Sequence, residues 1–396
     1  MSETLVPVRL HSLDPVRALV LRRLRRWRHG HLTLRLPEGG IVTLGDPAAP
    51  ERAHASVHDD AFFARVLLGG EVGAGEAYQD GLWDADDLPL LLRLFVRNLD
   101  ALEFDSPLAR LGQLAGLVAH RLRRNTRAGS ARNVHAHYDL GNDFYRLWLD
   151  ESMAYSCALW QDGDSLERAQ QRKVEALARK LELRAGDRLL EIGTGWGGFA
   201  RHAVGLGCRV TTITLSREQQ RHAAALGLDA RLCDYRDAGA LGLFDKLVSI
   251  EMFEQVGAAY FGDFFAACAR ALRPGGRMVM QTIAMPDQRW ARYRRNVDWT
   301  QKHIFPGSCI PAPAVMLGAM AASSDLVLRG LEDIGPHYAP TLREWRRRFR
   351  ARAAELRALG FDLRFLRTWE LYLAFSEATF AERRLQDLQL VLARMA

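Results

Sequence analysis

The chain has 396 residues, of which 48% are hydrophobic and 26% are charged, a composition typical of a folded globular protein with room for two domains. The sequence contains no apolar run of the ~20 residues that a membrane-spanning helix requires, which excludes a helical integral membrane protein. The first residues lack the basic and apolar regions of a signal peptide. The five cysteines are scattered, which argues for reduced thiols in the cytoplasm rather than for disulfides or a cysteine metal site.

The formal net charge is +7, and nearly all of the basic side chains are arginine. The arginines concentrate in residues 17–28 and again in residues 121–127. Most charge of this kind is solvated surface, but a basic cluster can also bind anionic lipid headgroups or nucleic acid. Composition alone leaves both partners open.

Residues 1–103 are expected to form a first, smaller α+β domain, which contains no recognisable nucleotide-binding loop. Its predicted elements are a basic amphipathic helix, a β-hairpin and two further helices, over Pro15–Trp27, His31–Leu36 with Ile41–Leu44, Phe62–Leu68 and Asp87–Leu99. The helix predicted over Phe62–Leu68 is expected to end at Gly69-Gly70. Residues 104–132 are predicted to be a linker that carries an amphipathic helix over Leu108–Leu122.

Residues 133–396 alternate between strand and helix patterns. The strand candidates are Arg188–Ile192, Arg209–Thr214, Ala230–Cys233, Lys246–Ile250 and Arg277–Ile283. This alternation predicts an α/β fold, an open and mostly parallel sheet covered by helices, with ligands at the carboxyl ends of the strands. The segment Pro286–Ala322 interrupts the pattern and is either a cover for an apolar substrate or an ordinary helical insertion.

A glycine-rich turn follows the first of these strands, and the rest of the domain is organised around it. Glu191 precedes Gly193, Gly195 and Gly197, and a helix pattern begins directly afterwards. Glycines permit positive φ and leave room for a ligand beside the backbone. A dinucleotide fold uses a similar turn but needs an acid at the end of the next strand, where this chain has Thr214. The form E-x-G-x-G-x-G resembles the first motif of class I S-adenosylmethionine (SAM) methyltransferases.

Polar residues beyond the other strands are further candidates for a site. Asp234 and Tyr235 follow the third strand and suit an adenine site, because the carboxylate accepts from the amino group and the ring offers a flat face. Glu251 and Glu254 follow the fourth strand, and we expect only one of them to be catalytic. Two histidines lie at i and i+2 within Asn133–Tyr145, a spacing unlike that of common zinc sites. We therefore expect no metal and interpret that segment as a cap over the cofactor.

Longer motifs occur in a fixed order along residues 133–396. They are HYDLGNDFYRLWLDESMAYSCALW (137–160), EIGTGWGGFA, TLSREQ, DYRD, SIEMFEQVG, IFPGSCIP and WELYLAFSEATFAERRLQDLQLVLAR. Together they resemble the cyclopropane-fatty-acyl-phospholipid synthase family of SAM-dependent methyltransferases. The earlier stretch GEAYQDGLWDADDL (75–88) resembles that family's N-terminal lipid-interacting domain.

The resemblance implies a class I methyltransferase (Rossmann-like) sheet with helical insertions that cover a lipid. It implies that the SAM methyl group is transferred to the cis double bond of an unsaturated phospholipid acyl chain, and that the carbocation loses a proton to a bound bicarbonate and closes to a cyclopropane. By resemblance, the bicarbonate is held by Cys157, Glu254 and Tyr338 with the backbone of Ile283. The implied SAM contacts are Tyr155, Ser156, Gly193, Gly195, Gly197, Thr214, Gln219, Asp234 and Tyr235.

One position departs from the family pattern. The fifth strand carries Gln281-Thr-Ile283 where well-known synthases have a histidine first. Glutamine can donate a hydrogen bond to bicarbonate but does not carry a positive charge. Related methyltransferases of the superfamily leave a methylene or methyl branch, so the substitution bears on ring closure more than on methyl transfer.

The resemblance also implies peripheral association with the inner surface of the membrane and allows a homodimer. We expect the Pro15–Trp27 helix to lie on anionic headgroups, with Leu19, Leu24 and Trp27 toward the acyl region. Two other classes of protein compete with this interpretation. A lipid-binding protein with a degenerate methyltransferase domain is disfavoured by the intact glycine turn. A nucleic-acid methyltransferase is disfavoured because the chain lacks an NPPY-type or Pro-Cys catalytic motif, so no nucleic-acid partner is expected.

Overall fold

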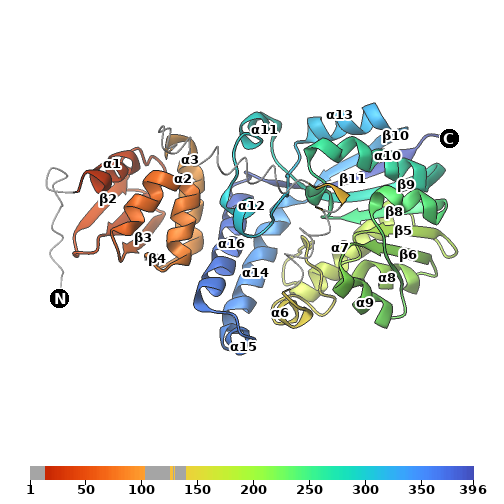
Figure 1. The fold of residues 1–396 in the computed structure, drawn as a ribbon, viewed down its shortest axis with the longest axis horizontal. Helices are drawn as coiled ribbons and strands as arrows, with labels where there is room; N and C mark the ends of the chain where they lie inside the picture. Colours follow the sequence, from red (N-terminus) through yellow and green to blue (C-terminus); the bar gives the residue numbers. More distant parts are fainter. Residues whose placement is uncertain (1–13, 103–124, 128, 130–139) are drawn as a thin grey trace. The chain divides into compact units, whose positions relative to one another are not determined.

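The computed structural model describes residues 14–102, 125–127, 129 and 140–396, and the chain forms two compact units (Figure 1). The described part of the first unit comprises residues 14–102 together with Arg295–Ile304 and Ala353–Glu382. Two segments that the sequence analysis assigned to residues 133–396 therefore pack in the first unit. Most of the predicted linker lies outside the described residues.

A mixed four-stranded sheet in the order β2-β1-β3-β4 lies at the centre of the first unit. β1 (His31–Arg35) and β2 (Ile41–Gly45) form an antiparallel pair, which confirms the predicted hairpin. β3 (Arg52–Val57) runs parallel to β1, and β4 (Trp83–Ala85) pairs antiparallel with β3. Sequence patterns missed β3 because its buried face carries only two alanines and a valine.

Helices pack on this sheet and on one another. Those in the described part of the unit are α1 (Pro15–Leu24), α2 (Ala61–Gln79), α3 (Leu88–Leu102), α12 (Trp299–His303), α15 (Ala353–Ala358) and α16 (Leu363–Ala381). The expected helix end at Gly69-Gly70 corresponds to a break within α2: Gly70 has a non-helical φ of 55° and ψ of −131°, and a second helical stretch follows the kink and ends at Gln79.

The long helix α16 is held in the first unit by contacts between residues far apart in sequence. The Arg367 guanidinium lies 4.0 Å from the ring centroid of Tyr78 and donates to the backbone oxygens of Tyr78 and Trp83 at 2.5 and 2.8 Å. Glu382, just past α16, accepts from Arg93 Nε of α3 at 2.9 Å. These contacts explain why a helix near the end of the sequence packs with the N-terminal sheet.

The basic helix α1 differs from its prediction at its end and in its apolar face. It ends at Leu24, and Trp27 is only 5% exposed, so the expectation that Trp27 faces an acyl region is wrong. Arg17 is also buried, because its guanidinium pairs with Glu38 and lies 5.4 Å from the Phe63 ring centroid. The arginines of this segment that remain exposed are Arg22, Arg25, Arg26 and Arg28.

A seven-stranded sheet in the order β10-β11-β9-β8-β5-β6-β7 forms the second unit. Its strands are β5 (Arg188–Ile192), β6 (Arg209–Thr214), β7 (Asp229–Leu232), β8 (Phe244–Ile250), β9 (Leu272–Ala284), β10 (Leu326–Asp333) and β11 (Gln386–Arg394). β5 to β9 are parallel and correspond to the five predicted strands, which confirms the α/β class. β10 and β11 are antiparallel additions that the sequence analysis did not identify.

Helices cover both faces of this sheet (Figure 1). The helices in the described part of this unit are α6 (Asn142–Arg146), α7 (Leu166–Leu181), α8 (Gly198–Gly205), α9 (Arg217–Ala225), α10 (Phe261–Ala271), α11 (Asp287–Tyr293), α13 (Pro313–Ser323) and α14 (Tyr338–Ala351). Of these, α7 and α8 pack on one face of the sheet, and α10 and α13 pack on the other. Neighbouring strand residues alternate between two cores. Met278 and Met280 pack with α10 and α13, whereas Val279 packs with α7 and α8. Among the described residues, none of the helices has the length and apolar character needed to cross a membrane.

We predict that Asn98 of α3 is needed for the stability of the first unit. Its buried amide accepts from the N–H groups of Arg28 and His29 at 2.6 and 3.0 Å and donates to the oxygens of His29 and Leu94 at 2.9 and 2.8 Å. Asn98→Ala leaves buried backbone groups unpaired, so the free energy of unfolding should fall by about 2 kcal/mol. Amide hydrogen exchange should also accelerate at residues 28 and 29. The exposed Asp100→Ala on the same helix is the control, and unchanged exchange in Asn98→Ala would contradict the prediction.

Candidate active site

The glycine turn joins β5 to α8 at the carboxyl edge of the sheet. Gly193, Gly195 and Gly197 have φ values of 98°, 51° and 84°, so all three adopt the left-handed backbone that glycine permits. A Cβ at Gly193 would come within 3.2 Å of Met252, and one at Gly197 within 2.7 Å of Leu228. A Cβ at Gly195 would meet nothing within 4 Å. The first and third glycines therefore allow close packing, and the middle one borders open space.

The Glu191 side chain is part of a hydrogen-bond network that links the glycine turn to β6. It is 2% exposed, and its Oε2 accepts a hydrogen bond from Thr212 Oγ1 of β6 at 2.7 Å. Thr212 Oγ1 also lies 2.7 Å from Thr194 Oγ1, within the turn itself. Burial raises the pKa of the Glu191 carboxyl to about 8, so it is mostly protonated at neutral pH. Its role in this structure is to connect the turn to β6.

The next strand end brings together the predicted pair of Thr214 and Gln219. Thr214 Oγ1 donates to Gln219 Oε1 at 2.8 Å and also accepts from the backbone N–H of Ser216 at 3.0 Å. Ser216 caps α9 by accepting from the Gln219 N–H at 3.3 Å. The geometry is a polar corner beside the glycine turn.

The third strand end is arranged differently from the expected adenine site. The Asp234 carboxylate accepts from Arg236 Nη1 at 2.9 Å, and both side chains are nearly buried. The Tyr235 ring packs 5.3 Å from Phe264 in the core, and its hydroxyl is buried without a hydrogen-bond partner. Arg236, which the sequence analysis overlooked, lies 4.9 Å from the Tyr235 ring centroid and 5.2 Å from that of Tyr260.

Tyr155 and Ser156 come from the loop before α7 and face different surroundings. The Tyr155 ring lies 5.3 Å from Trp345 and 5.5 Å from Trp148, in an aromatic group between this loop and α14. Ser156 Oγ accepts from Lys173 Nζ at 2.6 Å. Lys173 is 2% exposed, and burial lowers the pKa of its ammonium group. It is one of the few lysines in an arginine-rich chain, a signal that could have marked it.

The Glu251 carboxylate is the centre of a buried polar cluster. Its Oε1 accepts from the backbone N–H of Cys157 at 2.7 Å and from Gln281 Nε2 at 2.8 Å. Its Oε2 accepts from the Tyr338 hydroxyl at 2.5 Å. These three donors belong to residues that the sequence analysis expected to surround a bicarbonate. The Cys157 thiol is not among the donors, because it is fully buried and directed at backbone oxygens of Ala158 and Ile334.

Glu254 occupies a separate position. Its Oε1 accepts from the Thr282 hydroxyl at 2.9 Å and from the Ile283 backbone N–H, and its Oε2 is buried without a hydrogen-bond partner. Burial, reinforced by the nearby charge of Glu251, raises the pKa of Glu254 to about 8. The five expected bicarbonate residues are thus brought together, but around two carboxyl groups of the protein.

Gln281 is held in one orientation by the neighbouring strand β11. Its Oε1 accepts from Gln389 Nε2 at 2.9 Å, and Gln389 Oε1 accepts from Lys180 Nζ at 2.5 Å. Gln281 Nε2 therefore faces Glu251 and also donates to Asp387 Oδ2 at 3.0 Å. Burial and the charges of the two glutamates hold the pKa of Asp387 well above its usual range. The sequence analysis missed Asp387 and Gln389, although two polar residues at i and i+2 in an apolar strand were a usable signal.

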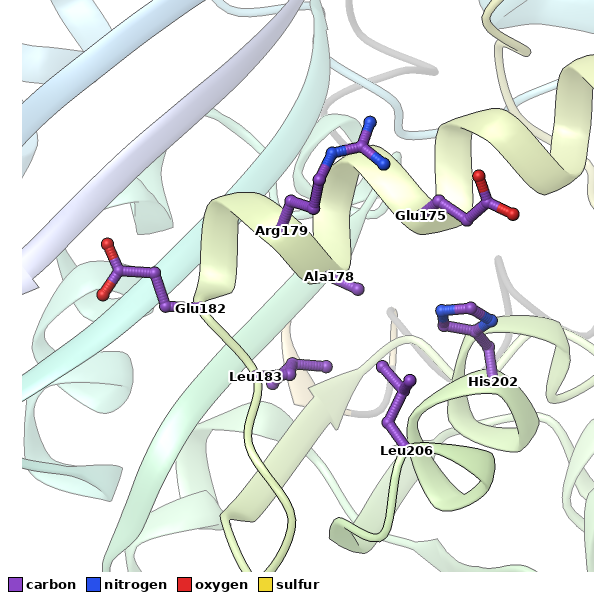
Figure 2. A pocket seen from close by; sticks show the side chains of 7 residues that line it. All are labelled: Glu175, Ala178, Arg179, Glu182, Leu183, His202 and Leu206. Carbon is purple, nitrogen blue, oxygen red and sulfur yellow. The ribbon is translucent and has the colours of Figure 1, made fainter.

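A hollow of about 290 Å³ lies elsewhere, between α7 and α8 (Figure 2). It is lined by Glu175, Ala178, Arg179, Glu182, Leu183, His202 and Leu206. These residues come from the C-terminal parts of the two helices, whereas the glycine turn enters α8 at its N-terminus. The hollow is therefore distinct from the candidate site. The histidine segment proposed as a cap falls largely outside the described residues, and the described residues contain no group of three or more potential metal ligands.

Comparison with known proteins identifies the family. The sequence model described as mycolic acid cyclopropane synthetase matches residues 125–390. The chain belongs to this family. It is 38% identical to the tuberculostearic acid methyltransferase of Mycobacterium tuberculosis, over 95% of this chain and 91% of that protein. It is 36% identical to the cyclopropane-fatty-acyl-phospholipid synthase of Escherichia coli, over 91% of each.

Solved structures of the family have the same fold. A cyclopropane synthase from Mycobacterium tuberculosis aligns with a TM-score of 0.62 and 29% identity, covering 67% of this chain and 98% of that one. A mycolic acid cyclopropane synthase crystallised with SAH and CTAB aligns with a TM-score of 0.61 and 28% identity, over the same shares. The predicted family, the class I methyltransferase fold and the enzyme class are confirmed: this is a SAM-dependent methyltransferase of a lipid-modifying family.

We predict that Gly195→Val abolishes SAM binding. The open side of Gly195 is where a ligand can approach the backbone, and a branched side chain would fill that space. Gly186→Val is a matched control, because Gly186 also has a positive φ of 87° and open surroundings but precedes β5 at the opposite end of the strand. Calorimetry should show SAM binding to Gly186→Val and none to Gly195→Val. Equal affinity in the two variants would mean that the cofactor binds elsewhere.

Proposed function

We propose that this protein transfers the methyl group of SAM to the cis double bond of an unsaturated phospholipid acyl chain. The observation that carries the proposal is the position of the glycine turn next to the carboxyl cluster. A Cβ at Gly193 would come within 3.2 Å of Met252, the residue that follows Glu251, so the turn and the cluster are neighbours and a ligand bound at the turn is expected to lie beside the cluster. Bound SAM supplies an electrophilic methyl group, and Gly195, Thr214, Gln219, Tyr155 and Ser156 are the residues proposed to hold it.

The surroundings suit a reaction that passes through a carbocation. An alkene is a weak nucleophile, so the protein must place it accurately, exclude water and provide a base. Tyr338 and Tyr155 both lie near Trp345, with ring centroids 6.1 and 5.3 Å from it, and Tyr338 also contacts Glu251. Aromatic rings attract a cation through their faces while staying inert toward it. The proposed site therefore combines aromatic walls with a carboxylate.

Two products are compatible with this chemistry. Cyclopropane formation is the first candidate, in keeping with the synthase of Escherichia coli at 36% identity. A methylene- or methyl-branched chain is the second, favoured by Gln281 in place of histidine and by the relative at 38% identity, whose name describes methyl transfer rather than ring formation. Both routes start from the same cation: proton loss from the transferred methyl group closes the ring, whereas a hydride shift onto the cationic carbon followed by proton loss from the methyl group leaves a methylene branch. A saturated methyl branch requires, in addition, a later reduction of that methylene by a separate reductant.

We further propose that the protein works from the cytoplasm at the inner membrane surface, as a peripheral protein that can form a homodimer. The exposed arginines of the first unit, Arg22, Arg25, Arg26 and Arg28, support electrostatic attachment to anionic headgroups. Leu19 is 48% exposed beside them and can enter the headgroup region. Burial of Arg17 and Trp27 removes these two residues from the proposed contact.

We predict that the protein, expressed in cells that contain unsaturated phospholipids, adds one methyl-derived carbon from labelled SAM to their acyl chains. Cyclopropane and methylene products are isomers, so mass spectrometry must include fragmentation to separate them. Gly195→Val provides the inactive control. If no label enters lipid, the result would favour a lipid-binding protein with a degenerate methyltransferase domain. If label enters nucleic acid, it would favour a nucleic-acid methyltransferase.

We also predict salt-sensitive binding to vesicles of dioleoylphosphatidylglycerol. Each arginine near an anionic surface contributes ~1 kcal/mol, so replacing Arg22, Arg25 and Arg26 by serine should weaken binding on the order of 100-fold at low salt. Serine at Arg201, Arg209 and Arg270, three exposed arginines of the second unit, gives a charge-matched control. Equal binding of both triple variants, or binding that salt leaves unchanged, would contradict attachment through α1.

A further inference from the structure

We propose that the Glu251 carboxylate is the base that removes the proton from the methylated acyl chain, and that it does so in place of a bound bicarbonate. This inference rests on the proposed function and specifies the group that completes its reaction. The family resemblance suggested Glu254 as the acid at this site and an external anion as the base. The contacts of the described residues favour a different assignment.

The donors that would hold a bicarbonate are already used by side chains of the protein. The Cys157 N–H, Gln281 Nε2 and the Tyr338 hydroxyl all donate to Glu251, and the Ile283 N–H donates to Glu254. An added anion would find these donors occupied and would lie against the Glu251 carboxylate, which has the same sign of charge. The residues present therefore do not fit bicarbonate, because Glu251 takes its position.

The backbone conformation of Glu251 is strained in the position that brings its carboxylate to these donors. Glu251 has a φ of 47°, a backbone conformation that is uncommon and unfavourable for residues other than glycine. The backbone N–H of Glu251 donates to the backbone oxygen of Gln281 at 2.8 Å. This hydrogen bond between the end of β8 and β9 fixes Glu251 at this dihedral angle. Strained residues cluster at functional sites. Here the strained backbone directs the Glu251 carboxylate toward its three donors, the Cys157 N–H, Gln281 Nε2 and the Tyr338 hydroxyl.

The hydrogen bonds around Glu251 leave it able to accept a proton. Among the described residues, Oε1 accepts hydrogen bonds from Cys157 and Gln281 and Oε2 accepts one from Tyr338, and the Asp387 carboxyl lies within hydrogen-bonding reach of the same side chain. Oε2 is therefore the less occupied of the two oxygens. Asp387 and Glu254 have raised pKa values and can remain neutral nearby, while the buried Lys173 ammonium opposes the Glu251 charge. The three donors that face Glu251 are the arrangement that suits a carboxylate at this position.

The proposed step balances without another reactant. The alkene π pair forms the new C–C bond to the methyl carbon, and the C–S bond breaks with its electron pair left on sulfur. The adjacent carbon becomes cationic. Glu251 Oε2 then takes a proton from one of two places. Removal from the transferred methyl group lets the pair of that C–H bond close the ring onto the cationic carbon, whereas removal from a carbon next to the cation leaves the pair as the double bond of a branched alkene. The proton leaves Glu251 to water after product release.

The test measures methyl transfer from labelled SAM to dioleoylphosphatidylglycerol vesicles, with and without ¹³C-bicarbonate, in buffer freed of carbon dioxide. Wild type should be equally active in both buffers, and its bicarbonate ¹³C signal should not broaden. Glu251→Gln should lose at least ~100-fold in turnover, as expected when a general base is removed, with little change in SAM affinity by calorimetry. Glu182→Gln is the matched control, because Glu182 also has a positive φ, of 54°, but caps α7 away from the site.

Glu251→Gly adds a variant that relieves the backbone strain and opens the position to a small anion. Its turnover should be low, and added bicarbonate should restore part of it and broaden the ¹³C signal. Wild-type activity that disappears without bicarbonate, or near-normal turnover of Glu251→Gln, would overturn the inference while leaving the proposed function intact. A wild-type protein that transfers no methyl group to any lipid would instead refute the proposed function.

Discussion

Three separate parts of the second unit meet on a single, partly buried carboxylate. Cys157 in the loop before α7, Gln281 in β9 and Tyr338 at the start of α14 all donate hydrogen bonds to Glu251. A buried charge without partners costs several kcal/mol or more, so each of these segments must stay in place for the others to be stable. The carboxylate thus links a loop, a strand and a helix, and the loop and the start of the helix also meet through Thr341 and His337.

A second layer of polar residues maintains this arrangement. Gln389 orients the Gln281 amide, and Lys180 in turn orients Gln389, so the direction of one donor is determined two residues away, on α7. Such networks are rigid when every member is satisfied and fail together when one is lost. The apolar cores on the two faces of the sheet provide the stability that lets the strands tolerate these polar groups between them.

Much of the second unit could be read from the sequence because its signals are local. Apolar runs predicted β5 to β9, and glycine spacing predicted the turn at Gly193–Gly197. Contacts between residues far apart in sequence could not be predicted in this way. One example is α16, which packs in the first unit through Arg367 and Glu382, and another is Tyr235, whose ring packs in the core. Glu251 and Glu254 both follow β8. The positive φ at Glu251 determines which of the two carboxyl groups faces the donors of Cys157, Gln281 and Tyr338.

The position of β11 has a consequence for how the protein is made. β11 lies between β9 and β10 in the sheet, yet it follows every other strand in the sequence and supplies Asp387 and Gln389. While the ribosome is still adding this segment, β9 has an open edge and Gln281 lacks the neighbour that orients its amide. Insertion of β11 closes the sheet and completes the polar cluster around Glu251 in the same event. A nascent chain therefore gains the complete site only when the sheet is closed, and incomplete chains carry an exposed strand edge that marks them for chaperones.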